Sequence, residues 1–170
     1  HCNKEVAAVL HIDVTHGSFS ETESLYYVME CPACMKPIIL DCIDEITFPG
    51  TLPFDNVKNL PENVSTIYNE CRKSCGDGCF TASVLLARTL LNHIAVDNGA
   101  KENQSFKYYV DYLIENYMPK NSSKWVDAIR VLANDSAHNL EIMGSEQAEL
   151  VIKFLMYLLK FIYELPNELT

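Results

Sequence analysis

Residues 61–75, PENVSTIYNECRKSC, decide how the chain divides. Their apolar side chains recur every three or four residues, at Val64, Ile67, Tyr68, Cys71 and Cys75. This spacing gathers them on one face of a helix. Pro61 suits the first turn of such a helix, and the carboxylate of Glu62 suits the positive end of the helix dipole. The stretch therefore predicts a helix, and we expect it to open a helical region.

The same spacing recurs in four later stretches, which cover residues 79–96, 105–118, 122–140 and 146–165. Breaker residues separate or end several of them: the Gly-Asp-Gly run at 76–78, Pro119 and Pro166. Short connections between helices favour antiparallel neighbours. The sequence therefore predicts an antiparallel bundle of about five helices over residues 58–170.

The last of these stretches, residues 146–165, is apolar on nearly every side. A helix of this kind lies either at the centre of a bundle or under a partner chain. The second alternative motivates a homodimer formed through the helical bundle. Lys153 and Lys160 interrupt the stretch, and no run of about 18 uncharged apolar residues occurs, so we expect no membrane partner.

The first 48 residues follow a different pattern. Residues 5–14, 24–31 and 36–43 are rich in β-branched, aromatic and aliphatic side chains, as strands are. Pro49-Gly50 and the loop after it end this part. We therefore predict a mainly α-helical fold, in which a small β segment at residues 1–48, similar to a zinc ribbon, precedes the bundle.

A Cys-Pro-Ala-Cys pair, Cys31 and Cys34, motivates the comparison with a zinc ribbon. Zinc ribbons hold one tetrahedral ion between two such turns. The chain opens with HCNKEV, which resembles the end of a second turn, so Cys2 is the third expected ligand and a further one is expected upstream of His1. We predict structural zinc, held less firmly by three thiolates than by four. The alternative is a pair of thiols in a loop.

The fourth zinc ligand stays open, because no spacing favours any one of His1, His11, His16 and Cys42. The seven cysteines are odd in number and the chain is longer than a typical disulfide scaffold. Reduced cysteines in a bacterial cytoplasm therefore fit better than a secreted framework. Cys71, Cys75 and Cys79 are predicted to be core or loop thiols.

The net charge of −10 argues against a broad surface that grips phosphates. One arginine of the predicted helices, Arg88, could still bind a phosphate on its own. Arg88 lies among apolar neighbours, where an arginine usually pairs with a carboxylate such as that of Glu70, and phosphate binding is the alternative.

Residues 122–140 carry a polar stripe opposite their apolar face. Arg130, Asn134 and His138 fall four residues apart, so a helix places them on one side. A histidine can act as general acid or base, an arginine can steady a phosphate, and an asparagine can orient either. These roles suffice for metal-free cleavage of RNA by its own 2′-hydroxyl. The alternative is an ordinary solvated helix face.

Several motifs, in order, resemble the bacterial domain of unknown function family 4145. Its pattern L-P-x-x-I-x-x-x-Y-x-E-A is matched at Leu60, Pro61, Tyr68 and Glu70. The A-x-x-x-x-R-x-x-L-E helix of that family is matched at Ala87, Arg88 and Leu91, with Asn92 where the family usually has Glu. Its I-R-x-x-G-N-x-x-A-H signature resembles residues 129–138, with Ala133 in the Gly place. Its Y-x-x-P ending is matched at Tyr163 and Pro166.

That family is similar to the wider HEPN group of helical domains. Many HEPN members are metal-independent ribonucleases that act as dimers, with an Arg-x(4–6)-His motif from each subunit at a shared cleft. Others are inactive binding or regulatory modules, and the group is common in bacterial defence systems. The resemblance therefore implies a defence or nucleic-acid-processing context, with RNA as a partner to test.

This sequence departs from the active motif at Ala133, where active members often carry the arginine. The nearest arginine, Arg130, leaves seven residues before His138, so its reach differs by about one turn, roughly 5 Å. Catalytic geometry tolerates less than that. We therefore expect a non-catalytic binding or regulatory module, with a metal-independent endoribonuclease at a dimer cleft as the alternative.

Overall fold

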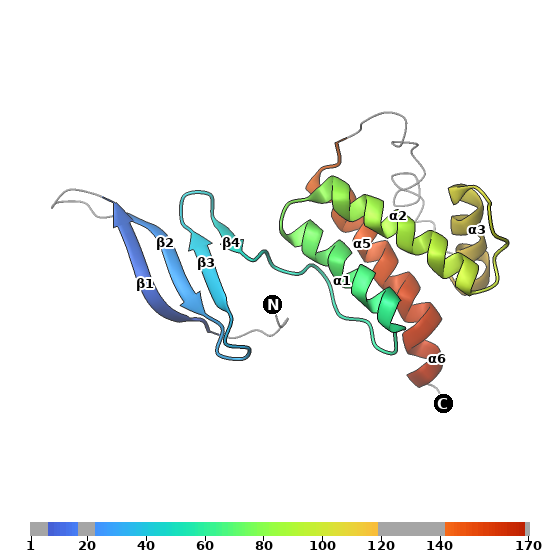
Figure 1. The fold of residues 1–170 in the computed structure, drawn as a ribbon, viewed down its shortest axis with the longest axis horizontal. Coiled ribbons are helices and arrows are strands. Elements are labelled where there is room, and N and C mark those ends of the chain that lie inside the picture. Colours follow the sequence, from blue (N-terminus) through green and yellow to red (C-terminus); the bar gives the residue numbers. More distant parts are fainter. Residues whose placement is uncertain (1–6, 17–22, 119–141, 169–170) are drawn as a thin grey trace. The chain divides into compact units, whose positions relative to one another are not determined.

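The computed structural model describes residues 7–16, 23–118 and 142–168 (Figure 1). The chain divides into two compact units, His1–Leu52 and Pro53–Thr170. We call them the sheet unit and the helical unit. The described residues combine a small antiparallel sheet with a set of packed helices, so the coarse prediction of a mainly α-helical fold after a β segment is confirmed.

The sheet unit forms four antiparallel strands in the order β1-β2-β3-β4. They are β1 Val9–His16, β2 Glu23–Glu30, β3 Pro37–Asp41 and β4 Ile46–Phe48. The first three overlap the predicted strands. The three-residue strand β4 was not predicted, because so short a run shows no clear alternation.

The strand register of the sheet unit shows which strand ends meet at the same edge. Val9 pairs with Glu30, and Glu30 pairs with Pro37, so β1 begins at the edge where β2 ends and β3 starts. Among the residues of this unit whose exposure is described, only Cys31 and Asp41 are buried. The unit is thus a single layer with little core of its own.

The helical unit begins with three helices that match the predicted stretches closely. They are α1 Glu62–Gly76, α2 Phe80–Asp97 and α3 Phe106–Tyr117. The hydroxyl of Ser105 caps α3 by accepting a hydrogen bond from the amide of Tyr108 at 3.3 Å. Helix α2 packs against α1, α3 and the later helix α5, so it is central to this unit (Figure 1).

The C-terminal helix α5, Ser145–Leu159, supplies a large part of the core. Its buried apolar side chains are Ala148, Val151, Ile152, Phe154, Leu155, Met156, Leu158 and Leu159. They are covered within their own chain, because α5 packs against both α1 and α2 (Figure 1). The apolar character of this helix is therefore explained by a central position in the bundle.

The prediction that Pro166 ends the last helix is wrong. One wide turn of π-helix, Lys160–Glu164, follows α5 and leads into a further helical turn, α6 Leu165–Glu168. The amide of Leu165 donates to the carbonyl of Lys160, five residues back. The wide turn lets the helix continue past Pro166, which has no N–H to contribute.

The predicted helix at residues 122–140 lies outside the described residues. The five-helix bundle therefore stays a prediction. Among the helices of the described ranges, none is long and apolar enough to cross a bilayer.

Candidate functional site

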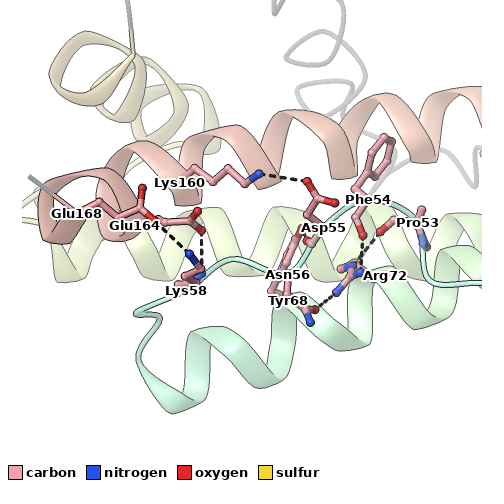
Figure 2. Close-up of polar contacts among 10 residues, drawn as sticks. All are labelled: Pro53, Phe54, Asp55, Asn56, Lys58, Tyr68, Arg72, Lys160, Glu164 and Glu168. Carbon is pink, nitrogen blue, oxygen red and sulfur yellow. Dashed lines mark hydrogen bonds and ion pairs between the residues drawn. The ribbon is translucent and has the colours of Figure 1, made fainter. Parts of the chain in front are cut away.

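The most developed polar site in the described chain surrounds Arg72 of α1 (Figure 2). The side chain of Arg72 is 0% exposed. It points toward residues 53–58, the segment that leads into α1. Val57 in this segment is buried in the core, and Phe54 packs against the same core. These apolar contacts bring the carbonyl groups of the segment within reach of α1.

The guanidinium of Arg72 is held by four hydrogen bonds. Its Nε donates to the carbonyl of Pro53 at 2.8 Å, and its Nη2 donates to the carbonyl of Phe54. Its Nη1 donates to Oδ1 of Asn56 and, at 3.1 Å, to Oδ1 of Asn69. A guanidinium has five N–H groups in all. Arg72 therefore has almost no donor capacity left for a ligand.

Main-chain and amide oxygens surround Arg72 instead of a directly bonded carboxylate. Burial lowers the pKa of Arg72, while the charges of Tyr68 and Asp55 act in the opposite direction. A buried charge is costly unless it is fully hydrogen-bonded. Acceptors satisfy four of its five N–H groups, so this arginine holds the segment before α1 in place.

Phe54 has an unusual backbone, with φ at 59°. A bulky residue in this left-handed region is strained. The conformation turns its carbonyl toward Arg72, and the hydrogen bond from Nη2 offsets part of the cost. The local backbone thus depends on the buried arginine.

Tyr68, one turn before Arg72 on α1, binds the same segment. Its hydroxyl donates to the carbonyl of Asp55 at 2.9 Å. The guanidinium carbon of Arg72 lies 5.5 Å from the centroid of the Tyr68 ring, a cation–π contact. Burial, the largest cause, raises the pKa of Tyr68 to about 12. Tyr68 therefore stays a neutral donor at physiological pH.

The C-terminal helices hold the outer side of the segment (Figure 2). Lys160 forms an ion pair with Asp55 at 3.3 Å. The amide of Lys58 donates to Glu164 at 2.8 Å, and its ammonium group pairs with Glu168 at 3.2 Å. Exposed pairs of this kind contribute little individually. Together with Arg72 they fasten residues 53–58 between α1 and the C-terminal helices.

A second polar cluster gathers at Asn98, the residue that follows α2. The hydroxyl of Tyr112 donates to its carbonyl at 2.8 Å, and the hydroxyl of Tyr117 donates to its Oδ1 at 3.4 Å. Its Nδ2 donates to the hydroxyl of Tyr163 at 3.3 Å. Burial is the main cause that raises the pKa of Tyr163. The tyrosine of the Y-x-x-P ending thus ties the C-terminal π turn to the end of α2.

The predicted catalytic residues Arg130, Asn134 and His138 lie outside the described residues, as do the expected zinc ligand Cys2 and the candidate His1. Arg72 was not predicted as a site residue. Its position four residues after Tyr68, at the border of the apolar stripe of α1, could have indicated a buried arginine. A cation buried there needs hydrogen-bond acceptors from the same chain.

Cys31 and Cys34 lie on a tight turn between β2 and β3. The amide of Met35 donates to the carbonyl of Cys31 at 2.8 Å. The amide of Cys31 donates to the carbonyl of Lys36 at 3.0 Å. Met35 adopts a left-handed backbone with φ at 58°. Cys31 is 3% exposed and Cys34 is half-buried. The turn therefore presents two thiols close together in sequence at one edge of the sheet.

Strand register removes two of the four candidates for the fourth ligand. Cys42 follows Asp41, which pairs with Tyr26, at the opposite end of β3 from the turn. Five residues of strand, at about 3.3 Å each, separate Cys42 from that turn by roughly 16 Å. His16, which pairs with Glu23, lies at the same far end. Neither can share an ion with Cys31 and Cys34. Within the described ranges, no group of three metal-ligating side chains occurs.

The remaining singled-out residues have structural positions. Cys71 and Cys75 are buried in the core and Cys79 is exposed at the turn before α2, which confirms the core-or-loop prediction. Burial is the main cause that raises the pKa of Cys71 to about 12. The guanidinium of Arg88 lies 4.6 Å from the ring centroid of Phe106, so α2 and α3 share a cation–π contact.

The described helices and sheet define a mainly α-helical protein with a small antiparallel sheet before the helices. The family model for the domain of unknown function DUF4145 matches residues 69–170. This chain belongs to that family, which confirms the family resemblance seen in the sequence. Searches of curated proteins and of solved structures find no match to the chain.

Proposed function

We propose that this chain is a non-catalytic binding or regulatory module in a bacterial defence or nucleic-acid-processing context. The context rests on the likeness between its family and the HEPN group. One observation supports the non-catalytic assignment: acceptors of the same chain take four of the five N–H groups of the buried Arg72 guanidinium. A cation that serves a reaction needs donors left for the substrate.

Two neighbouring ionisable groups support the same proposal. The Tyr68 hydroxyl already donates its hydrogen bond to the carbonyl of Asp55. Burial raises the pKa of the Cys71 thiol far above that of a reactive thiol. Both groups are neutral at physiological pH. The well-formed polar site of the helical unit therefore supports a rigid scaffold, on which binding surfaces are built.

A ribonuclease assay tests this proposal directly. Labelled single-stranded RNA is incubated with the wild type, with His138→Ala and with His93→Ala in the presence of a chelator. His93 is a matched control, because it is an exposed histidine on α2 that contacts Asn63 and Asp97. We expect the same background from all three proteins.

Cleavage that the wild type and His93→Ala share, and that His138→Ala loses, contradicts the proposal. That result establishes the alternative, a metal-independent endoribonuclease that uses Arg130, Asn134 and His138. Such an enzyme requires the homodimer through the helical bundle, because each subunit supplies one motif to the shared cleft.

We also propose that Cys31 and Cys34 bind a structural zinc ion together with Cys2. The tight turn at Met35 and the burial of Cys31 support this proposal. So does topology, because β1 begins at the same edge of the sheet as this turn, and Cys2 precedes β1 in sequence. Zinc bound there would stabilise a unit that has little core of its own.

Elemental analysis of the purified chain tests the zinc proposal, with Cys31→Ser and the matched control Cys42→Ser. We expect about one zinc per chain in the wild type and in Cys42→Ser, and a large loss in Cys31→Ser. A wild type that retains no zinc, or an equal loss from both variants, contradicts it.

A further inference from the structure

One face of the sheet unit carries an uncharged row of apolar side chains across all four strands. Ile12 pairs with Val28, Val28 with Ile39, and Ile39 with Phe48. Directly paired residues of antiparallel strands lie on the same face. These four residues therefore form one continuous line, which we call the apolar row.

The apolar row and its neighbours are exposed. Ile12, Ile39 and Phe48 are 54%, 40% and 49% exposed. Tyr26 lies two residues before Val28, and Ile46 lies two residues before Phe48, so both are on the same face, and both are exposed. A single layer with an apolar face needs a second layer to cover it.

Charge identifies the kind of surface that fits. The apolar row has no charged member, while the rows beside it contain Asp41 on one side and Glu30 on the other. Oδ1 of Asp41 accepts hydrogen bonds from the amides of Ile43 and Asp44, so this carboxylate is engaged in the turn to β4. The row itself is thus suited to an uncharged partner and has nothing that recognises phosphate.

A second copy of this chain satisfies these conditions. An interface with two-fold symmetry places the same patch on both sides, so the patch must complement itself. An uncharged apolar row meets this condition, because it brings no like charges together. The chain carries a net charge of −10, so copies repel each other where carboxylates dominate. The apolar row lets two copies approach, because the buried Asp41 beside it is already bonded within the turn to β4 and Glu30 lies at the rim of the interface.

We propose that two copies of this chain associate face to face through the apolar row and form a two-layered sheet. The exposed apolar side chains offer on the order of 400 Å² per copy, so two copies bury roughly 800 Å² before the rim is counted. Specific interfaces start at about 1,200 Å². The dimer is therefore expected to be weak and reversible. This proposal concerns the sheet unit alone and does not depend on the proposed function.

Sedimentation velocity of the full chain over a wide concentration range tests the interface. We expect the wild type to dimerise as its concentration rises. Ile39→Lys places an unpaired charge in the centre of the contact and should weaken the dimer at least about tenfold. Ile39→Thr keeps a β-branched residue in the strand, so it preserves the sheet. It removes apolar area from the contact and should weaken the dimer several-fold.

Two variants serve as matched controls. Ile43→Lys adds the same charge at an exposed isoleucine of the same unit, and Leu85→Lys adds it at an exposed leucine of α2. Both should dimerise as the wild type does. The proposal is overturned if the wild type stays monomeric throughout, if both Ile39 variants dimerise normally, or if Leu85→Lys alone abolishes the dimer.

Discussion

The guanidinium carbon of Arg72 lies 5.5 Å from the centre of the Tyr68 ring, and both side chains hold the main chain of residues 53–55. Arg72 supplies charged donors and Tyr68 supplies a neutral one. Each covers part of the other from water, since Tyr68 is 1% exposed and Arg72 is 0% exposed. The two residues therefore act as one unit that fixes the entry to α1.

Tyr68→Phe removes the hydroxyl but keeps the ring over Arg72. The carbonyl of Asp55 then loses its donor, and we expect the free energy of unfolding to fall by about 1 kcal/mol. Urea unfolding followed by circular dichroism measures the change. Tyr108→Phe is the control, because Tyr108 lies on the exposed side of α3. An equal, negligible effect of both substitutions would show that the Tyr68 hydroxyl contributes nothing.

Alkaline pH should destabilise the protein through Cys71. Burial raises the pKa of this thiol from 9.0 to about 12 in the folded chain. Above pH 9 the unfolded chain releases a proton that the folded chain keeps, so stability is complete below pH 9 and falls as pH rises. The slope is about 1.4 kcal/mol per pH unit for this one group. Tyr68 adds a loss of the same sign above pH 10.

Cys71→Ala removes this titration, so its stability should change less steeply than that of the wild type between pH 9 and pH 10. Urea unfolding at several pH values gives the two slopes. Cys79→Ala, at the exposed cysteine before α2, should keep the wild-type slope. Identical slopes for the wild type and Cys71→Ala would refute the assignment.

Alanine substitutions at two glycines distinguish the cost of a left-handed backbone from the cost of a side-chain contact. Gly99 has φ at 98°, and a Cβ atom there would lie 3.2 Å from the hydroxyl of Tyr112. Gly78 has φ at 78°, with open space around a Cβ atom. We expect Gly78→Ala to cost about 1 kcal/mol, from the left-handed backbone alone. Gly99→Ala should cost about 1 kcal/mol more, because the Tyr112 bond to Asn98 must shift. Thermal or urea unfolding compares them, and equal costs would show that Tyr112 gives way freely.

The helices α1, α2 and α3 could be predicted from the sequence because their signals are local. Apolar spacing in each stretch reports which face is buried, and the Gly-Asp-Gly run and Pro119 mark ends within a few residues of the periodic pattern. The burial of Cys71 and Cys75 followed from the same spacing. These inferences need no knowledge of what lies across the core.

The Arg72 site could not be predicted in the same way, because three of its four acceptors come from residues 53–56, which precede α1 in a loop. Spacing along α1 places Arg72 near the apolar stripe but says nothing of which carbonyls meet it. Cys42 stayed open as a zinc ligand for a similar reason, since only strand register places it at the far end of β3. The prediction that Pro166 ends the helix was wrong because the π turn just before it, Lys160–Glu164, changes which amides the helix needs.

Buried Arg72 serves the structure of the helical unit, and its replacement by an unbranched side chain without donors tests this role most directly. Arg72→Met leaves the carbonyls of Pro53 and Phe54 and the amide oxygens of Asn56 and Asn69 without this donor. Urea unfolding should show a loss of about 3 kcal/mol. Lys73→Met, at the exposed neighbouring position on α1, should stay within about 0.5 kcal/mol of the wild type. Equal stability of both variants would contradict the claim and reopen Arg72 as a residue kept for function.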